Sequence, residues 1–187
     1  MTAKIQKNMK VVNLVVTSDL DHSLNLETIA STISNTEYNP EQFPGLIMRI
    51  KDPKTAILLF SSGKMVCTGA RSISKAEESI QKVIKTLKKI NIIITIKPIL
   101  KVQNMVGSGE LNQDLDLNYL TMNLMNTEYE PEQFPGLVYK IKKPVPASFL
   151  LFTNGKFVCT GVKSEHEMII SLEKLKINLK KVIAKRK

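Results

Sequence analysis

Asparagine and threonine side chains recur at matched positions in two similar halves of this chain, within strand-like runs of apolar residues. Asn13 and Thr68 lie in the first half, and Asn104 and Thr160 lie at the equivalent positions of the second. Amide and hydroxyl groups donate and accept hydrogen bonds. These side chains therefore predict recognition by hydrogen bonding rather than bond chemistry.

No grouping of residues typical of an active site accompanies them. The sequence shows no carboxylate cluster, no Cys–His pair and no metal-ligand spacing. Cys67 and Cys159 occupy equivalent strand-like positions, far in sequence from His22 and His166, the only histidines. Zinc sites and disulfides need clustered ligands or a second thiol. We therefore predict two buried, unbridged cysteines, no metal, no cofactor and no enzymatic activity.

Two copies of one unit fill most of the chain. The segment 35–46, Asn-Thr-Glu-Tyr-Asn-Pro-Glu-Gln-Phe-Pro-Gly-Leu, returns almost unchanged 91 residues later, and the block 63–69 returns 92 residues later. Such duplication predicts a pseudo-two-fold body, which suits a target that is itself nearly symmetric, such as duplex DNA. We divide the chain into four parts: an N-terminal tail (1–9), a first repeat (10–97), a second repeat (98–183) and a basic C-terminal tail (184–187).

The charge balance favours a polyanionic partner. Lysine and arginine number 27 against 17 aspartates and glutamates, which gives a formal net charge of +10. Charge of this sign favours nucleic acid, although it does not distinguish DNA from RNA or an anionic membrane. No apolar run reaches the roughly twenty residues that span a bilayer, and residues 1–10 lack the apolar stretch of a signal peptide. We expect a soluble, intracellular protein.

Each half is predicted to fold as strand, helix, three strands and helix. β-branched residues dominate 10–17, and the N-cap residues Asn25 and Asp116 precede short helical patterns. Turn residues separate three further strand-like runs, which predict an antiparallel meander. These runs are 46–51, 55–61 and 64–70.

A longer helix closes each half. A capping box of Ser74 and Glu77 is predicted to begin it in the first half, and Ser164 with Glu167 does so in the second. The run 90–106 is rich in β-branched residues and predicts a strand-rich crossing between the halves. The fold class is α+β, with one curved antiparallel β-sheet and helices on a single face.

The sheet face opposite the helices carries an unexpected pattern. A sheet face exposed to solvent should carry polar residues at the outward-pointing positions of each strand. Here none of these positions is charged. A broad exposed apolar patch usually marks a binding surface. The outward positions are Asn13, Val15, Thr17, Ala56, Leu58, Phe60, Val66 and Thr68 in the first half, and Asn104, Val106, Ser108, Ser148, Leu150, Phe152, Val158 and Thr160 in the second.

Two further phenylalanines, Phe43 and Phe134, each come directly before a Pro-Gly pair at the start of a strand. An aromatic residue at such a turn is either a core plug or a projecting wedge, and composition alone favours the plug. Pairing with Phe60 and Phe152, on a face without a covering helix, shifts the interpretation toward wedges.

Together these residues resemble the TATA-box-binding protein family over about residues 10–182. The resemblance rests on the duplicated Glu-Tyr-x-Pro-Glu-x-Phe-Pro-Gly and Gly-Lys-x-Val-x-Thr-Gly blocks and on Gln103-Asn104-Met105-Val106-Gly107. It implies a saddle-shaped sheet, with helices on the convex face, that kinks the DNA minor groove with apolar wedges, a mechanism of which this family is itself the standard example. The lack of a long polar N-terminal extension favours the compact archaeal type, acting at a cytoplasmic nucleoid; a eukaryotic member would be nuclear.

The resemblance also implies roles for individual residues. The intercalating pairs are Phe43 with Phe60 and Phe134 with Phe152. The central hydrogen-bonding groups are Asn13, Thr68, Asn104 and Thr160, and the apolar contacts to the groove floor are Val15, Leu58, Val66, Val106, Leu150 and Val158. The positions suited to phosphates are Arg49, Lys64, Arg71, Lys140, Lys156 and Lys163. The loop that binds transcription factor B matches Glu130, Glu132 and Gln133.

The chemistry of the groove agrees with these roles. A·T pairs offer only acceptors in the minor groove, whereas G·C adds the guanine amino group. An apolar floor would leave that amino group unpaired, at a cost of roughly 1–3 kcal/mol. We therefore expect a general transcription initiation factor that binds an A·T-rich promoter element in double-stranded DNA as a monomer, bends it and presents it to transcription factor B and, indirectly, RNA polymerase.

Three other interpretations stay open at this point. The chain could be a basic architectural DNA-binding protein, or a saddle-type accessory domain of a nucleic-acid enzyme. A protein-only adaptor would explain the apolar patch but not the symmetric asparagine and threonine pairs. A weak homodimer off DNA is also left open, and the resemblance does not explain the net charge of +10.

Overall fold

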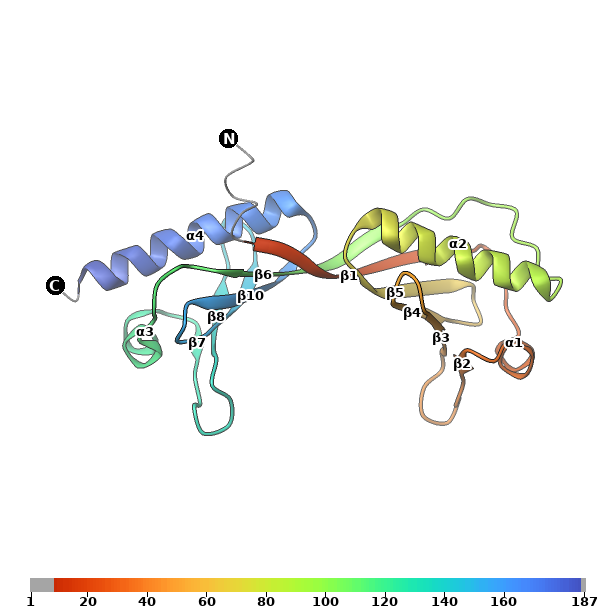
Figure 1. The fold of residues 1–187 in the computed structure, drawn as a ribbon, viewed down its shortest axis with the longest axis horizontal. Helices are drawn as coiled ribbons and strands as arrows, with labels where there is room; N and C mark the ends of the chain where they lie inside the picture. Colours follow the sequence, from red (N-terminus) through yellow and green to blue (C-terminus); the bar gives the residue numbers. More distant parts are fainter. Residues whose placement is uncertain (1–8, 186–187) are drawn as a thin grey trace. The chain divides into compact units, whose positions relative to one another are not determined.

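The computed structural model describes residues 9–185 and divides into two compact units (Figure 1). The first unit comprises residues 13–103, and the second comprises residues 104–185 together with 9–12. Most of the predicted N-terminal tail, and Arg186 and Lys187 of the predicted basic tail, lie outside the described residues. The elements in chain order are β1 (Met9–Asp19), α1 (Leu26–Thr32), β2 (Thr36–Glu37), β3 (Leu46–Ile50), β4 (Thr55–Leu59), β5 (Lys64–Ala70), α2 (Ile73–Lys89), β6 (Lys101–Glu110), α3 (Leu117–Asn123), β7 (Thr127–Glu128), β8 (Leu137–Ile141), β9 (Ala147–Leu151), β10 (Lys156–Val162) and α4 (Glu165–Ala184).

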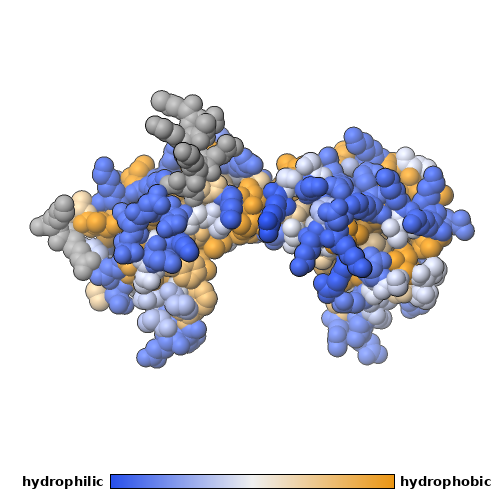
Figure 2. Space-filling model, in the orientation of Figure 1, coloured by the Kyte–Doolittle hydropathy of each residue, from blue (hydrophilic) through white to orange (hydrophobic). Residues whose placement is uncertain are grey.

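The strands of each unit pair in an antiparallel meander. In the first unit the order is β2-β3-β4-β5-β1, and in the second it is β7-β8-β9-β10-β6. Helix α2 packs on β4 and β5, and α4 packs on β10. Hydrophilic side chains cover the outer surface of α2 (Figure 2). The predicted α+β class, with an antiparallel sheet and a helix-covered face, is confirmed.

The hydrophobic core of each unit lies between the sheet and its long helix. The strand residues that alternate with the predicted outward positions of the first unit form its core, and five of them are at most 1% exposed. The apolar stripe of α4 is also buried. The residues of the first set are Leu14, Ile57, Leu59, Met65 and Cys67, and those of the second are Met168, Leu172, Leu175, Leu179 and Val182.

Three of the four predicted helix starts are confirmed. The side chains of Asn25, Asp116 and Ser164 each accept a hydrogen bond from the backbone N–H three residues later. The predicted capping box at Ser74 is wrong. Helix α2 begins at Ile73, and the side chain of Ser72 accepts from the Lys75 N–H at 3.2 Å. Ser72 is the residue in extended conformation before the first turn, so its hydroxyl, rather than that of Ser74, reaches the unpaired N–H groups.

The predicted strand-rich crossing at 90–106 is correct only from Lys101 onward. Residues 90–100 form neither helix nor strand. β-branched residues favour a strand only where a neighbouring strand offers hydrogen bonds, and within the described chain no strand pairs with this run. Pro98 also lacks the N–H that a ladder would need.

Both cysteines are free and buried, as predicted. Burial raises the pKa of the Cys67 thiol to about 11 and that of Cys159 to about 12. The thiolate is the reactive form, so both side chains act as small apolar core residues.

Residues 9–185 contain neither a helix suited to crossing a membrane nor a group of metal ligands. No helix there combines the length and apolar character needed to cross a bilayer. No three side chains among His, Cys, Asp and Glu in the same range gather closely enough to hold a metal ion.

Candidate nucleic-acid interface

The uncovered sheet face of the first unit brings together the predicted outward residues of β1, β4 and β5. Val15 lies opposite Thr68, which also lies opposite Ala56, and Leu58 lies opposite Val66. These side chains are half-buried, whereas their neighbours along each strand are mostly buried. A contiguous patch of valine, leucine and alanine therefore faces away from α2.

The second unit repeats this arrangement. Val158 lies between Leu150 of β9 and Ser108 of β6, and Thr160 lies opposite Ser148. Each of these side chains is half-buried, as is Val106. Both units thus present an apolar face with a few short polar side chains.

One asparagine on each face is held in a fixed orientation. In the first unit Asn13 Oδ1 accepts a hydrogen bond from the Gly69 N–H at 2.7 Å, and Asn13 Nδ2 donates to Thr68 Oγ1 at 3.3 Å. In the second unit Asn104 Oδ1 accepts from the Gly161 N–H at 2.9 Å, and its Nδ2 donates to Thr160 Oγ1 at 3.1 Å. We call each set an Asn–Thr–Gly cluster.

An irregularity in the strand pairing builds this cluster. The register of β5 against β1 shifts between Leu14 and Val15, and that of β10 against β6 shifts between Cys159 and Val162. Gly69 and Gly161 lie at these shifts with φ of 95° and 88°, a conformation that glycine adopts without steric cost. Each bulge points a backbone N–H at the asparagine oxygen.

The orientation decides which hydrogen bonds remain available. A primary amide carries two N–H donors on nitrogen. The backbone N–H occupies the oxygen, and the threonine takes one of the two donors. The second Nδ2 hydrogen is left to donate outward, so each face presents a donor to a ligand that offers acceptors.

The four predicted phenylalanines form two edge-to-face pairs. The ring centroids of Phe43 and Phe60 lie 5.9 Å apart, and those of Phe134 and Phe152 lie 6.2 Å apart. Phe43 is 37% exposed and Phe134 is 47% exposed. Large apolar rings are usually more deeply buried than this. The exposure argues against core plugs.

Glycine makes room for each pair. A Cβ atom at Gly45 would lie 2.6 Å from Phe43 and 3.1 Å from Phe60, and one at Gly136 would lie 2.6 Å from Phe134. The rings therefore rest directly on the glycine backbone. Sequence reasoning missed these glycines and those of the Asn–Thr–Gly clusters, although their recurrence in both repeated blocks was a usable signal.

The structure adds Gln103 as another residue that sequence reasoning did not assign to the site. Its Nε2 donates to Thr17 Oγ1 at 2.7 Å. Thr17 is on the outward parity of β1, so Gln103 joins the polar groups beside the first unit's face.

The predicted phosphate-binding residues fall into two groups. Arg49 forms two hydrogen bonds to Glu37, at 2.9 and 3.2 Å, and Lys140 Nζ lies 2.5 Å from Glu128 Oε1. The hydrogen bond and charge of Arg49 lower the pKa of Glu37, and Glu37 raises the pKa of Arg49. These two cations are partly neutralised by their partners.

The other four basic residues are exposed, and within residues 9–185 none of their charged groups forms an ion pair. They are Lys64, Arg71, Lys156 and Lys163. Unpaired surface cations are the groups best suited to attract phosphates.

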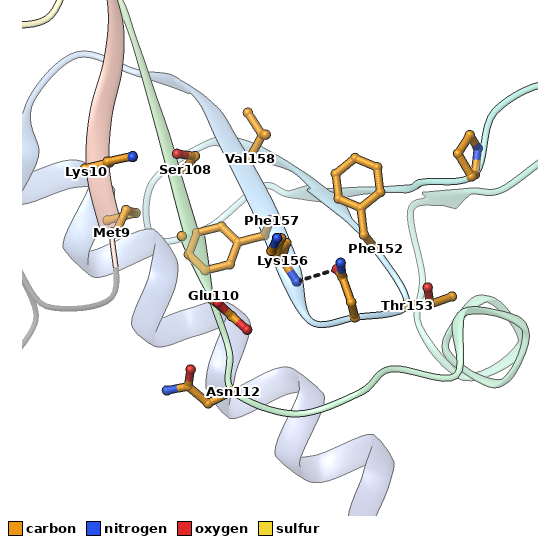
Figure 3. Close-up of a pocket in the computed structure, with 13 residues that line it drawn as sticks. Met9, Lys10, Ser108, Glu110, Asn112, Phe152, Thr153, Lys156, Phe157 and Val158 are labelled. Carbon is orange, nitrogen blue, oxygen red and sulfur yellow. Dashed lines mark hydrogen bonds between the residues drawn. The ribbon is translucent and has the colours of Figure 1, made fainter.

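A hollow of about 880 Å³ adjoins the phenylalanine pair of the second unit. Phe152 and Val158 lie on one side of β10, and the ring of Phe157 points to the other side, toward α4 (Figure 3). Met9 and Lys10 of β1 also line the hollow. A hollow of about 1090 Å³ occupies the corresponding place in the first unit, lined by Phe60, Lys64 and Val66 among others. One ring of each phenylalanine pair, Phe60 or Phe152, therefore borders open space.

The acidic loop of the second unit is exposed. Glu130, Glu132 and Gln133 lie between β7 and β8, and Glu130 O accepts hydrogen bonds from the N–H groups of Gln133 and Phe134 at 3.0 and 2.9 Å. These bonds form a turn that leaves all three side chains in solvent. The loop of the first unit has the same backbone bonds around Asn39, which is uncharged.

Comparison with known proteins places the whole arrangement in one family. The model described as "Transcription factor TFIID (or TATA-binding protein, TBP)" matches residues 8–90 and 99–182. The chain belongs to the TATA-box-binding protein family. The resemblance expected from the sequence is confirmed, and with it membership in a family of DNA-binding transcription factors.

Individual relatives are similar over nearly their whole length. The TATA-box-binding protein of Thermococcus celer is 44% identical over 173 residues, which cover 92% of this chain and 91% of the relative. That of Methanocaldococcus jannaschii is 43% identical over 178 residues, covering 95% and 97%. A solved structure, "Methanococcus jannaschii TBP", matches with a TM-score of 0.87 at 44% identity, over 93% of this chain and 99% of that one. These relatives are archaeal, in agreement with the expected compact type.

Proposed function

We propose that this chain is a general transcription initiation factor that binds an A·T-rich, TATA-type promoter element through the minor groove. Each uncovered sheet face would lie on the groove floor, each phenylalanine pair would open a base step, and the exposed lysines and arginine would hold phosphates. The action is recognition and bending without bond chemistry.

The repeated Asn–Thr–Gly cluster carries this proposal. Each cluster presents an amide donor within an apolar patch, and the minor groove of A·T pairs offers only adenine N3 and thymine O2 acceptors. The guanine amino group of a G·C pair would face valine and leucine without an acceptor, at a cost of roughly 1–3 kcal/mol. The asparagine amide donor and the apolar sheet face together therefore favour binding to A·T pairs.

The exposed phenylalanines support the bending step. Rings that are 37% and 47% exposed on the uncovered face are free to enter a base step. Unstacking a step costs a few kcal/mol, which the wider contact with bent DNA offsets, as is established for this family.

The acidic loop of the second unit is the surface that we propose binds a protein partner. We propose that Glu130, Glu132 and Gln133 bind transcription factor B, which then recruits RNA polymerase. Their exposure and the neutral Asn39 at the equivalent of Glu130 give the second unit a distinct surface. A charge reversal of Glu130 and Glu132 to lysine should abolish the ternary complex and leave DNA binding intact, while Glu41→Lys in the first loop should change neither.

A bending assay tests the DNA proposal. Energy transfer between dyes at the two ends of a short duplex should rise when the protein binds a TATA-type duplex and stay low with a G·C-rich duplex at equal salt. Asn13→Asp keeps an oxygen for the Gly69 N–H but removes the outward donor, and it should weaken binding about tenfold or more. Asn118→Asp, at an exposed position of α3, makes the same charge change and serves as the control. Equal, unbent binding to both duplexes would leave only a basic DNA-coating protein.

A further inference from the structure

A second candidate binding place lies beside α4, on the helix side of the second unit. A hollow of about 500 Å³ opens between the connection from β6 to α3 and the C-terminal half of α4. Leu111, Leu179 and Ile183 supply its apolar lining, and Lys176 and Lys180 lie on its rim. Gln113 and Ala184 complete it. None of these residues belongs to the uncovered sheet face described above.

The first unit differs at the equivalent place. Leu20, the counterpart of Leu111, is 1% exposed, whereas Leu111 is half-buried. After α2 the chain turns at Asn91, and the Ile92 N–H donates to Leu87 O at 3.1 Å. The first unit thus turns its chain back at the end of the long helix and holds it there by a backbone hydrogen bond.

Helix α4 does not turn at that point. It continues to Ala184, three residues beyond the position equivalent to the end of α2 at Lys89. Within the described chain no segment lies over the hollow, which remains open in front of Leu111. In Figure 2, hydrophobic surface lies among hydrophilic surface along this half of α4. The first unit has a following chain segment at the equivalent place, and the apolar lining of the hollow suits a segment that carries an apolar side chain.

The rim adds a charge requirement. From Lys174 to Lys185, the end of α4 and the residue that follows it carry five lysines and no acidic residue. Lys176 stands where α2 has the half-buried Ile84. Among residues 9–185 no ion pair offsets Lys176 or Lys180. Their positive potential favours carboxylates on whatever enters the hollow.

The apolar lining distinguishes between two anionic partners. Nucleic acid phosphates need cations but gain nothing from leucine and isoleucine. A peptide that alternates acidic and apolar residues satisfies both the rim and the floor. We propose that this hollow docks a short, extended, acidic segment of a partner protein, with an isoleucine or leucine side chain against Leu111 and Ile183.

The test uses the full chain and a fluorescent peptide of alternating glutamate and isoleucine, followed by fluorescence anisotropy. Lys176→Glu with Lys180→Glu should weaken binding about tenfold or more, because two attractive charges become repulsive. The matched control, Lys85→Glu with Lys88→Glu on α2, should change binding little. Binding of the TATA-type duplex should be unaffected, which separates this proposal from the proposed function.

A second pair of variants tests the apolar floor. Ile183→Ser should weaken peptide binding about threefold to tenfold, since it removes floor area, whereas Ile177→Ser, on the same helix but outside the lining, should not. Three results would overturn the proposal. The first is an equal loss of peptide binding in both pairs of lysine variants, and the second is equal binding of a peptide with serine in place of isoleucine. The third is displacement of the peptide by a second copy of the chain or by a G·C-rich duplex, if that competitor's binding is weakened by the same variants.

Discussion

The two units carry the same exposed face on different cores. Beneath the first face lie Met48, Ile57 and Met65, and at the equivalent positions of the second lie Tyr139, Phe149 and Phe157. The rings of Phe149 and Phe157 pack at 5.9 Å, and Tyr139 Oη accepts a hydrogen bond from Asn178 at 2.7 Å.

The faces above these cores are closely alike. Both have an Asn–Thr–Gly cluster, a phenylalanine pair on a glycine and the same pattern of valine and leucine. The comparison teaches that the core tolerates aliphatic or aromatic packing as long as its volume is filled, whereas the uncovered face keeps one chemistry. That chemistry is what the proposed recognition of DNA requires.

The largest expected effect is a difference in stability between a core variant and a surface variant of the second unit. Phe149→Ala should lower the free energy of unfolding by about 3–5 kcal/mol, because it leaves a cavity among buried rings. Phe134→Ala, at an exposed ring, should lower it by about 1 kcal/mol or less. Urea unfolding followed by circular dichroism measures both. Similar losses would show that Phe134 is a core plug after all.

The next effect concerns bending. Phe43→Ala and Phe134→Ala should each reduce affinity for a TATA-type duplex about tenfold or more and lower the end-to-end energy transfer of the bound complex. Each variant should remove one of two kinks. A Phe134→Ala protein that bends the duplex as fully as the unaltered chain would refute the wedge role.

The glycines at the two β-bulges, Gly69 and Gly161, should differ in how much an alanine substitution destabilises the protein. Both have positive φ, so alanine should cost about 1–3 kcal/mol at either position. A Cβ at Gly69 would also lie 3.0 Å from Lys54 O, while at Gly161 the nearest atom would be 3.7 Å away. Gly69→Ala should therefore destabilise the protein more than Gly161→Ala in urea unfolding. Equal losses would mean that the backbone at Lys54, just before β4, moves readily to make room.

Salt dependence separates free from paired cations. Lys64→Ala should reduce the magnitude of the slope of log affinity against log salt by about 1, the value for one lost phosphate contact. Arg49→Ala should reduce it less, because Glu37 already offsets that charge. Binding titrations at several salt concentrations give both slopes. A larger change for Arg49 would indicate that DNA displaces Glu37.

The smallest effect is a pH dependence that arises from a carboxylate on the first unit's long helix. Hydrogen bonds from Lys75 and then Lys82 hold the pKa of Glu78 at about 2, below its ordinary 4.5. A lowered carboxyl pKa contributes stability above pH 4.5 that is lost as pH falls toward about 2. Helix α4 has Ile170 at the equivalent position. Unfolding measured at pH 6 and pH 3 should show a smaller acid loss in Glu78→Gln than in the unaltered chain.

Much of the fold was predictable because the sequence contains two copies of the same structural unit. The bounds of β5 were predicted correctly as 64–70, and the core parity of β1, β4 and β5 followed from simple alternation. The error at Ser74 arose because Ser72 and Ser74 are both good N-caps and Glu77 favoured the wrong one. Aligning the repeats would have resolved it, since Ser164 corresponds to Ser72.

The site was predictable in its residue types but not in its geometry. Symmetric asparagines indicated hydrogen bonding, yet nothing in the sequence tells that Gly69 and Gly161 lie at bulges that fix the amide orientation. Nor could it tell that Arg49 and Lys140 pair with Glu37 and Glu128 across short strands of two residues. Such strands are too brief for any periodicity, so those pairings depend on the folded structure.

The most direct test of minor-groove recognition uses inosine. An inosine·cytosine pair lacks the guanine amino group, so its minor groove resembles that of A·T while its major groove resembles that of G·C. Affinity should be measured for three duplexes: the TATA-type element, the same element with every A·T pair replaced by inosine·cytosine, and one with G·C replacements. The inosine duplex should bind nearly as tightly as the A·T duplex, and the G·C duplex should bind far more weakly. Equal weakness of the inosine and G·C duplexes would contradict minor-groove recognition, because the protein would then be recognising the major groove.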